Sequence, residues 1–122
     1  MQEQGKALEE RTKQFALAVL RLVRALPAAA AEQVLGRQLL RAGCAVGANY
    51  RAVRRSRSKR EFVARLAVVV EESDESIYWL DLLASGSPRQ IHELADVTQE
   101  ARELRAIFAA SLRTAKSALE QP

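Results

Sequence analysis

The chain has few of the residues that would support secretion, disulfide bonding or catalysis. Among its 122 residues there is one cysteine, Cys44, and one histidine, His92. A single cysteine excludes an internal disulfide, and the first ten residues lack the apolar segment of a secretory signal peptide. The longest aliphatic run, 66–70, is far shorter than the roughly 18 apolar residues that a membrane-spanning helix needs. We therefore expect a cytoplasmic protein that does not enter a membrane.

Glycine and proline are also scarce, with five and three residues, so long stretches are free to be helical. Hydrophobic residues make up 48% of the chain and charged residues 28%, the balance of an ordinary globular helical protein. A chain of this length can bury a core within one domain, which we expect to span residues 1–122. The formal net charge of +4 permits a polyanionic partner but does not require one.

Apolar residues recur at alternating spacings of three and four in four segments, which predicts amphipathic helices at about 6–26, 32–56, 59–84 and 88–119. Short connections favour an all-α, antiparallel up-down-up-down four-helix bundle. The positions predicted to face the core are Leu8, Thr12, Phe15, Val19, Leu22 and Leu26 in the first helix; Leu35, Leu39, Ala42, Val46, Asn49, Tyr50 and Val53 in the second; Phe62, Leu66, Val69, Ser73, Ile77, Leu80 and Ala84 in the third; and Leu94, Val97, Ala101, Leu104, Phe108, Leu112, Ala115 and Leu119 in the fourth.

Local signals set the helix ends. Pro27 ends the first helix, because proline cannot donate a hydrogen bond to the preceding turn. Ser58 with Glu61 forms the capping box that begins the third helix, and Gly86 ends it. Three residues predict the start of the fourth helix: Ser87, Pro88 and Gln90.

The second helix carries three glycines, which weaken a helix by about 1 kcal/mol each relative to alanine. Gly36, Gly43 and Gly47 therefore indicate a bend or a close approach to another helix near Gly47. Asn49 lies on the core side, where its amide is expected to bond to backbone near that point.

Basic residues cluster where the second and third helices meet. We call this cluster the basic elbow, and it comprises Arg51, Arg54, Arg55, Arg57, Lys59 and Arg60. Closely spaced Arg and Lys side chains bind phosphates and release counterions, so the elbow predicts a nucleic-acid-binding surface that Arg37 and Arg41 would extend. No aromatic residue lies among these positions, so base stacking is not expected. The alternative is a solubilising surface turn.

The third helix carries two further surface features. Glu71, Glu72, Asp74 and Glu75 spread over a wide arc, which indicates a solvated or ion-paired face rather than a metal site, or a face that meets arginines of a neighbouring subunit. The second feature, here called the α3 stripe, consists of Val68, Glu75, Trp79 and Leu82. A monomeric bundle does not need a second apolar stripe on one helix, so it predicts an oligomer interface. The alternative is that Trp79 covers the edge of the core.

Nothing in the sequence indicates an enzyme. His92 is expected to be a solvated surface residue, and Cys44 a small packing residue rather than a reactive thiol. Di-iron bundles place Glu-x-x-His on two helices, whereas the residue three before His92 is Arg89. We expect no catalytic residues, no metal and no cofactor.

Four groups of residues resemble proteins of the 23S rRNA intervening-sequence family over about residues 8–115. They are Gln38-Leu39-Leu40-Arg41-Ala42, Ala48-Asn49, Ser58-Lys59-Arg60-Glu61-Phe62 and Glu72-Ser73-Asp74-Glu75-Ser76-Ile77-Tyr78-Trp79-Leu80. The resemblance implies a small cytoplasmic bacterial four-helix bundle, often a homopentamer, encoded in many members within an insertion of the large-subunit rRNA gene. A related branch, the accessory variability proteins of diversity-generating retroelements, forms basic pentamers that bind a reverse transcriptase and its RNA.

The chain departs from the commoner family pattern I-P-A-N-I-A-E-G, because residues 46–53 lack its proline, its acidic residue and its final glycine. This departure concerns the end of the second helix and not the fold.

Residues and resemblance together lead to one functional hypothesis. We expect a non-enzymatic homo-oligomer that binds RNA or DNA through phosphate contacts. The alternative is an assembly or adaptor protein that binds a protein partner such as a retroelement reverse transcriptase.

Overall fold

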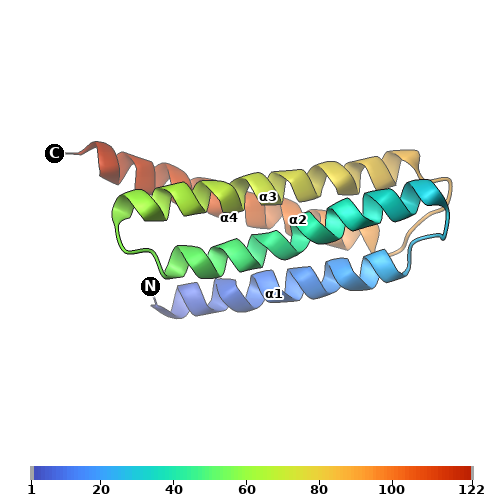
Figure 1. Cartoon of the computed structure of the whole chain (residues 1–122), viewed down its shortest axis with the longest axis horizontal. Coiled ribbons are helices and arrows are strands. Elements are labelled where there is room, and N and C mark those ends of the chain that lie inside the picture. Colours follow the sequence, from blue (N-terminus) through green and yellow to red (C-terminus); the bar gives the residue numbers. More distant parts are fainter. Residues whose placement is uncertain (1, 122) are drawn as a thin grey trace.

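Four α-helices form an antiparallel up-down-up-down bundle, as predicted (Figure 1). The computed structural model describes residues 2–121, and no strand occurs within that range. The helices are α1 (Gln2–Arg24), α2 (Ala30–Arg54), α3 (Lys59–Gly86) and α4 (Leu94–Glu120). α2 packs against α1 on one side and α3 on the other, α4 packs against α3, and α1 and α4 make a less extensive contact.

The core is built from the predicted apolar seams. Its fully buried side chains include one phenylalanine each from α1 and α4, together with leucines and valines of all four helices: Phe15, Val19, Leu22, Leu39, Val46, Val53, Leu66, Val69, Leu80, Leu83, Leu104 and Phe108. Tyr50 packs its ring against Phe108, with ring centroids 5.1 Å apart. The buried hydroxyls of Thr12 and Ser73 donate to carbonyls of their own helices, so the core tolerates them.

Three predicted core positions are wrong, and all lie near helix ends. Phe62 is 36% exposed and Leu119 is 38% exposed, while Ala84 is also exposed. Leu83 is buried in place of Ala84, because the buried positions of α3 keep strictly alternating spacings of three and four, which the predicted step from Leu80 to Ala84 breaks; these positions are Leu66, Val69, Ser73, Ser76, Leu80 and Leu83. Leu119 lies on the last turns of α4, which extend beyond the ends of the neighbouring helices (Figure 1).

The glycines of α2 allow α1 to approach closely, which was one of the two expectations for them. A Cβ atom added at Gly43 would lie 3.0 and 3.2 Å from the two methyl groups of Val19, and one added at Gly47 would lie 3.1 Å from Thr12 Oγ1. A Cβ at Gly36 would lie 2.8 Å from Leu26 Cδ1. Glycine is needed here because side chains of α1, and Leu26 just beyond its end, occupy the space that a larger residue would fill.

The start of α3 follows its sequence signal. Ser58 is the N-cap, and its Oγ accepts a hydrogen bond from the backbone N–H of Glu61 at 3.0 Å. The carboxylate of Glu61 pairs with Arg65 at 2.9 Å instead of returning to the cap residue. Half of the predicted capping box therefore forms, and it fixes the first residue of α3 at Lys59.

The predicted start of α4 at residue 88 is wrong, because α4 begins at Leu94. The Ser87 side chain does not cap a helix, and its buried Oγ has no hydrogen-bond partner among residues 2–121. Ile91, in the connection, packs against the core, and Leu94 is buried. The chain needs the residues after Gly86 to cross from α3 to α4 and to bury Ile91, so tertiary packing overrides the local capping signal.

Candidate functional site

The basic elbow occupies one end of the bundle, where α2 ends and α3 begins. Residues 55–58 form the whole connection, so the side chains of the elbow project from the last turn of α2, a short link and the first turn of α3. The backbone N–H of Arg55 bonds to the carbonyl of Ala52 and that of Ser56 to the carbonyl of Val53, at 3.1 and 3.0 Å. These bonds and the Ser58 cap hold the connection in one conformation, which keeps the positive charges close together.

Arg54 differs from the rest of the elbow because it turns back over α1. Its Nη1 atom lies 2.8 Å from Glu9 Oε2, and its guanidinium covers Gly5, where a Cβ would lie 2.6 Å from Arg54 Nε. Arg54 therefore ties the end of α2 to the start of α1, and a phosphate would have to compete with Glu9 for it.

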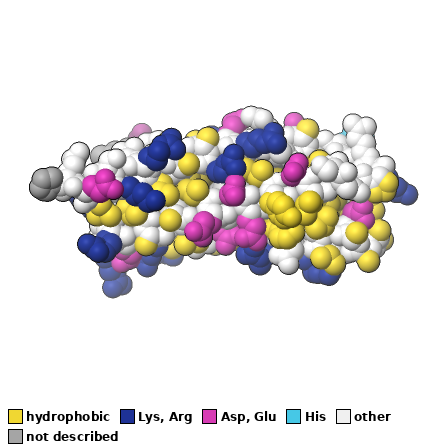
Figure 2. Space-filling model, turned by 90° about the horizontal axis from the view of Figure 1, so that it is seen from above, with side chains coloured by type: hydrophobic (Ala, Val, Ile, Leu, Met, Phe, Trp, Pro, Cys, Tyr) yellow, Lys and Arg dark blue, Asp and Glu magenta, His cyan; other side chains and the backbone are white. Residues whose placement is uncertain are grey.

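The other elbow residues are exposed: Arg51, Arg55, Arg57, Lys59 and Arg60. Among residues 2–121, none of these five forms an ion pair with a carboxylate. Lys and Arg side chains crowd the end of the molecule at the left of Figure 2, which is the end that carries the α2–α3 connection in Figure 1. The structure thus brings five solvated cations together at one end of the bundle.

Three arginines elsewhere in the bundle join one helix to another. Arg11 of α1 donates to both carboxylate oxygens of Glu100 at 2.8 Å and to Glu103 at 2.9 Å, and these hydrogen bonds raise the pKa of Arg11. Arg105 of α4 lies 2.6 Å from Asp74 of α3. Arg65 donates to the carbonyl of Ala52 at 2.7 Å, which satisfies a backbone oxygen near the C-terminus of α2.

The hydrophobic surface on α3 differs in detail from the predicted α3 stripe. Val68 is 36% exposed, but Trp79 and Leu82 are only partly exposed, and Trp79 packs against the core. Tyr78, which was not in the predicted stripe, is 55% exposed and contacts the Trp79 ring edge-on, with centroids 5.1 Å apart. In Figure 2 a hydrophobic group lies beside several carboxylates on the face seen there. Sequence reasoning missed Tyr78 because the heptad assigned only Trp79 to the stripe.

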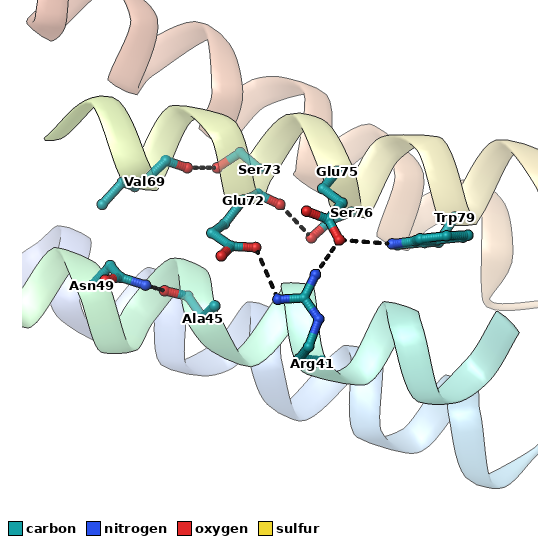
Figure 3. A network of polar contacts seen from close by, with 9 residues as sticks. All are labelled: Arg41, Ala45, Asn49, Val69, Glu72, Ser73, Glu75, Ser76 and Trp79. Carbon is teal, nitrogen blue, oxygen red and sulfur yellow. Dashed lines mark hydrogen bonds and ion pairs between the residues drawn. The ribbon is translucent and has the colours of Figure 1, made fainter. Parts of the chain in front are cut away.

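Arg41, predicted to extend the basic surface, joins α2 to α3 instead (Figure 3). Its guanidinium contacts Glu72 at 3.5 Å and hydrogen-bonds to Glu75, which raises the pKa of Arg41. The same Glu75 oxygen accepts a hydrogen bond from Trp79 Nε1 at 3.3 Å. A phosphate would therefore have to displace two carboxylates from Arg41.

Arg37, one turn earlier, is exposed and has no ion-pair partner in the described part of the chain.

The predicted acidic face is therefore ion-paired in three of its four positions, since Glu72, Glu75 and Asp74 contact arginines of the same chain and Glu71 is exposed. Asn49 donates its amide to the carbonyl of Ala45 at 2.8 Å, which is the backbone bond expected for it.

The residues considered for catalysis lie apart from one another. His92 is exposed in the turn before α4, and Cys44 is exposed rather than packed, in a groove of about 440 Å³ between α1 and α2. Within residues 2–121 no three or more His, Cys, Asp or Glu side chains are placed to hold a metal ion. In the same range, no helix combines the length and the hydrophobicity needed to span a membrane.

Comparison with known proteins identifies the fold. No protein-family model matches the chain, and no curated protein sequence matches it. The crystal structure of a protein of unknown function from the S23 ribosomal protein family of Bacteroides thetaiotaomicron is similar, with a TM-score of 0.80. The sequences are 23% identical, and the similarity covers 89% of this chain and 97% of that chain. At this identity the likeness establishes the helical fold.

Proposed function

We propose that this protein is a non-enzymatic, homo-oligomeric helical bundle that binds RNA or other nucleic acid through phosphate contacts at the basic elbow. One observation carries the proposal: Arg51, Arg55, Arg57, Lys59 and Arg60 are exposed and without carboxylate partners in the described chain. Arg11, Arg41 and Arg105, by contrast, are each paired with carboxylates of another helix. Unpaired, clustered cations are what phosphate binding requires.

The size of the electrostatic contribution follows from the number of free cations. Each phosphate contact adds about −0.7 to the slope of log K against log salt for a single strand, so five contacts give a slope of about −3.5. Raising the salt concentration fourfold should then weaken binding by about 100-fold per protomer. An oligomer presents several elbows, which increases both the affinity and the salt dependence.

The proposed assembly is supported by the exposed aromatic surface of α3. Tyr78 and Trp79 form one aromatic pair at the surface, and Val68 lies exposed on the same helix. Aromatic residues at the surface are typical of protein–protein interfaces. The resemblance to intervening-sequence proteins, among which homopentamers are common, supports the same assignment. The fold alone adds no functional detail, since the structurally similar protein is itself of unknown function.

Binding of a fluorescent single-stranded RNA, measured by anisotropy over a range of salt concentrations, tests the nucleic-acid proposal. The variant Arg55→Gln/Arg57→Gln/Arg60→Gln should lower the slope from about −3.5 to about −1.4, because two of the five contacts remain. Arg21→Gln/Arg24→Gln/Arg102→Gln is the matched control, because it removes the same charge from exposed positions outside the elbow. Equal losses in the two variants, or binding that does not change with salt, would contradict the assignment.

Light scattering at micromolar concentration tests the assembly. The wild type is expected to be an oligomer, and both Trp79→Ala and Tyr78→Ser are expected to shift it towards smaller species. Tyr78→Ser is the cleaner variant, because Tyr78 is largely exposed whereas Trp79 also packs against the core. A monomeric wild type would remove the homo-oligomer from the proposal.

The second candidate is an assembly protein for another protein, such as a reverse transcriptase, and the Tyr78–Trp79 pair is the observation that favours it. A reverse-transcriptase gene and a template-variable repeat beside this gene would support that candidate. Placement of the gene within an rRNA gene would support the intervening-sequence role.

A further inference from the structure

A groove of about 740 Å³ lies at the elbow end of the bundle, and all four helices contribute to it. Its apolar walls come from Leu8 of α1, Tyr50 and Val53 of α2 and Phe62 of α3, while α4 contributes small residues such as Ala115 and Ala118. The volume falls within the range of about 300–1,000 Å³ that is usual for ligand sites.

The charge around this groove has one sign. Arg57 and Lys59 of the basic elbow line it, together with the paired Arg54, and none of the described residues that line it is Asp or Glu. By contrast, the groove between α1 and α2 has both Glu9 and Glu10 on its walls. An anion with an apolar part therefore fits the elbow-end groove better than any cationic ligand.

Phe62 places an aromatic surface directly beside these cations. Its ring was expected in the core but is 36% exposed, and it lines the groove only three residues after Lys59. Positions 51–60 themselves hold no aromatic residue, which is why base stacking was not expected from the sequence. Folding brings Phe62 and the ring of Tyr50 to the groove beside the elbow.

The polar residues in the groove distinguish between amphipathic anions. Gln4, Ser56, Ser58 and Ser111 line it along with the apolar residues. Gln4 and Ser111 are exposed and can donate to and accept from the edge of a nucleobase, and the Ser58 hydroxyl, which accepts from Glu61 N–H, can still donate. A hydrocarbon chain offers these side chains no hydrogen-bond partner. A positively charged groove combined with an aromatic platform is typical of proteins that bind single-stranded nucleic acid.

We infer that the groove takes an unpaired base of a single-stranded nucleic acid, stacked on Phe62, while the neighbouring phosphates contact Arg57 and Lys59. This inference rests on the proposed function and adds a preference to it. A duplex keeps its bases stacked on one another and cannot place one against Phe62, so the protein should favour single strands over duplexes.

Two labelled probes of about twelve nucleotides test the inference, oligodeoxyadenylate and an abasic strand with the same phosphodiester backbone. Wild-type protein should bind the base-bearing strand roughly tenfold more tightly, because stacking one base contributes on the order of a factor of ten. Phe62→Leu should lose most of this difference without changing the affinity for the abasic strand. Val34→Ala, at an exposed apolar position at the other end of α2, is the control and should behave as wild type. Arg55→Gln/Arg60→Gln should weaken both probes equally.

The outcomes separate the two proposals. Equal, salt-dependent binding of both probes by wild-type protein would overturn the groove inference and leave phosphate binding in place. Binding of neither probe would overturn both. A third outcome would assign the groove to a protein partner instead. In that case the wild-type protein would bind an acidic, aromatic peptide more tightly than oligodeoxyadenylate, and Phe62→Leu would no longer bind the peptide. Photocrosslinking of a 5-iodouracil strand gives an independent readout, and the crosslink is expected within the peptide that contains Phe62.

Discussion

Replacing Gly43 by alanine tests how tightly α1 and α2 approach. Alanine favours a helix by about 1 kcal/mol over glycine, so at an uncrowded position the change would stabilise the protein. At Gly43 the new Cβ would meet three atoms of Val19, at 3.0, 3.2 and 3.4 Å. Val19 is fully buried, and a β-branched side chain in a helix has one strongly preferred rotamer, so it cannot rotate away.

The two contributions can be compared directly. Overpacking a core position costs about 1–3 kcal/mol, which exceeds the gain in helix propensity. We expect Gly43→Ala to lower the free energy of unfolding by about 1 kcal/mol. In a Val19→Ala background the two nearest atoms are gone, and there the same change should raise the free energy of unfolding by about 1 kcal/mol. The coupling between the two sites is then about 2 kcal/mol.

Urea unfolding followed by far-UV circular dichroism, at one protein concentration, measures all four members of this cycle. Gly86→Ala serves as the reference, because no atom lies within 4 Å of its added Cβ, and it should be neutral or slightly stabilising. If Gly43→Ala stabilised the wild-type protein as much as it stabilised the Val19→Ala variant, this result would refute the close approach of the two helices.

Three further predictions concern single side chains. Ser58→Ala should lower the free energy of unfolding by about 1 kcal/mol, because it removes the Oγ that accepts a hydrogen bond from Glu61 N–H. Ser85→Ala, at an exposed position within α3, is the control and should change the free energy of unfolding little. Equal effects of the two variants in urea unfolding would argue against the cap. The hydrogen bond from Gln99, followed by that from Arg11, lowers the pKa of Glu103 below 4.5. The stability that Glu103 contributes is therefore present at neutral pH and is lost as the pH falls through that lowered pKa. NMR titration should show the pKa of Glu103 rising in Gln99→Ala and in Arg11→Gln, and an unchanged pKa in both variants would contradict these contacts. Burial raises the pKa of Tyr50 above 10. The stability that Tyr50 contributes is therefore present below the pKa of the unfolded state and is lost as the pH rises through the pKa of the folded state. Tyr50→Phe should be less sensitive to alkaline unfolding than wild type, and equal sensitivity of the two proteins would rule out this cause.

The sequence predicted the bundle because the spacing of apolar residues is a local property that survives folding. Phe15, Leu39, Leu80 and Phe108 are buried where a period of 3.6 residues places them. The start of α4 was not predictable in this way, since the capping pattern at Ser87 is as good locally as that at Ser58. The two capping signals differ in their surroundings, because after Ser87 the connection must bury Ile91 against the core. Whether a connection has to bury such a residue depends on the distance between the helices that it joins.

The candidate site was predictable in part for the same reason. Clustering in the sequence is enough to place Arg55, Arg57 and Lys59 together at a short connection. The partners of Arg41 and Arg54 could not be inferred, because Glu75 and Glu9 lie 34 and 45 residues away and meet them only in one helix register. The exposure of Phe62 in a groove that it shares with α4 residues such as Ala115 could not be inferred either, because those residues are distant in the sequence.

The shared oxygen of Glu75 gives the protein a built-in optical reporter. Trp79 is the only tryptophan of the chain, and its indole N–H bonds to the same carboxylate oxygen that Arg41 holds. Any event that breaks the Arg41 pair changes the charge next to the indole and hence its emission. Intrinsic fluorescence, without a label, therefore reports on the contact between α2 and α3 and on association at the surface formed by Tyr78 and Trp79.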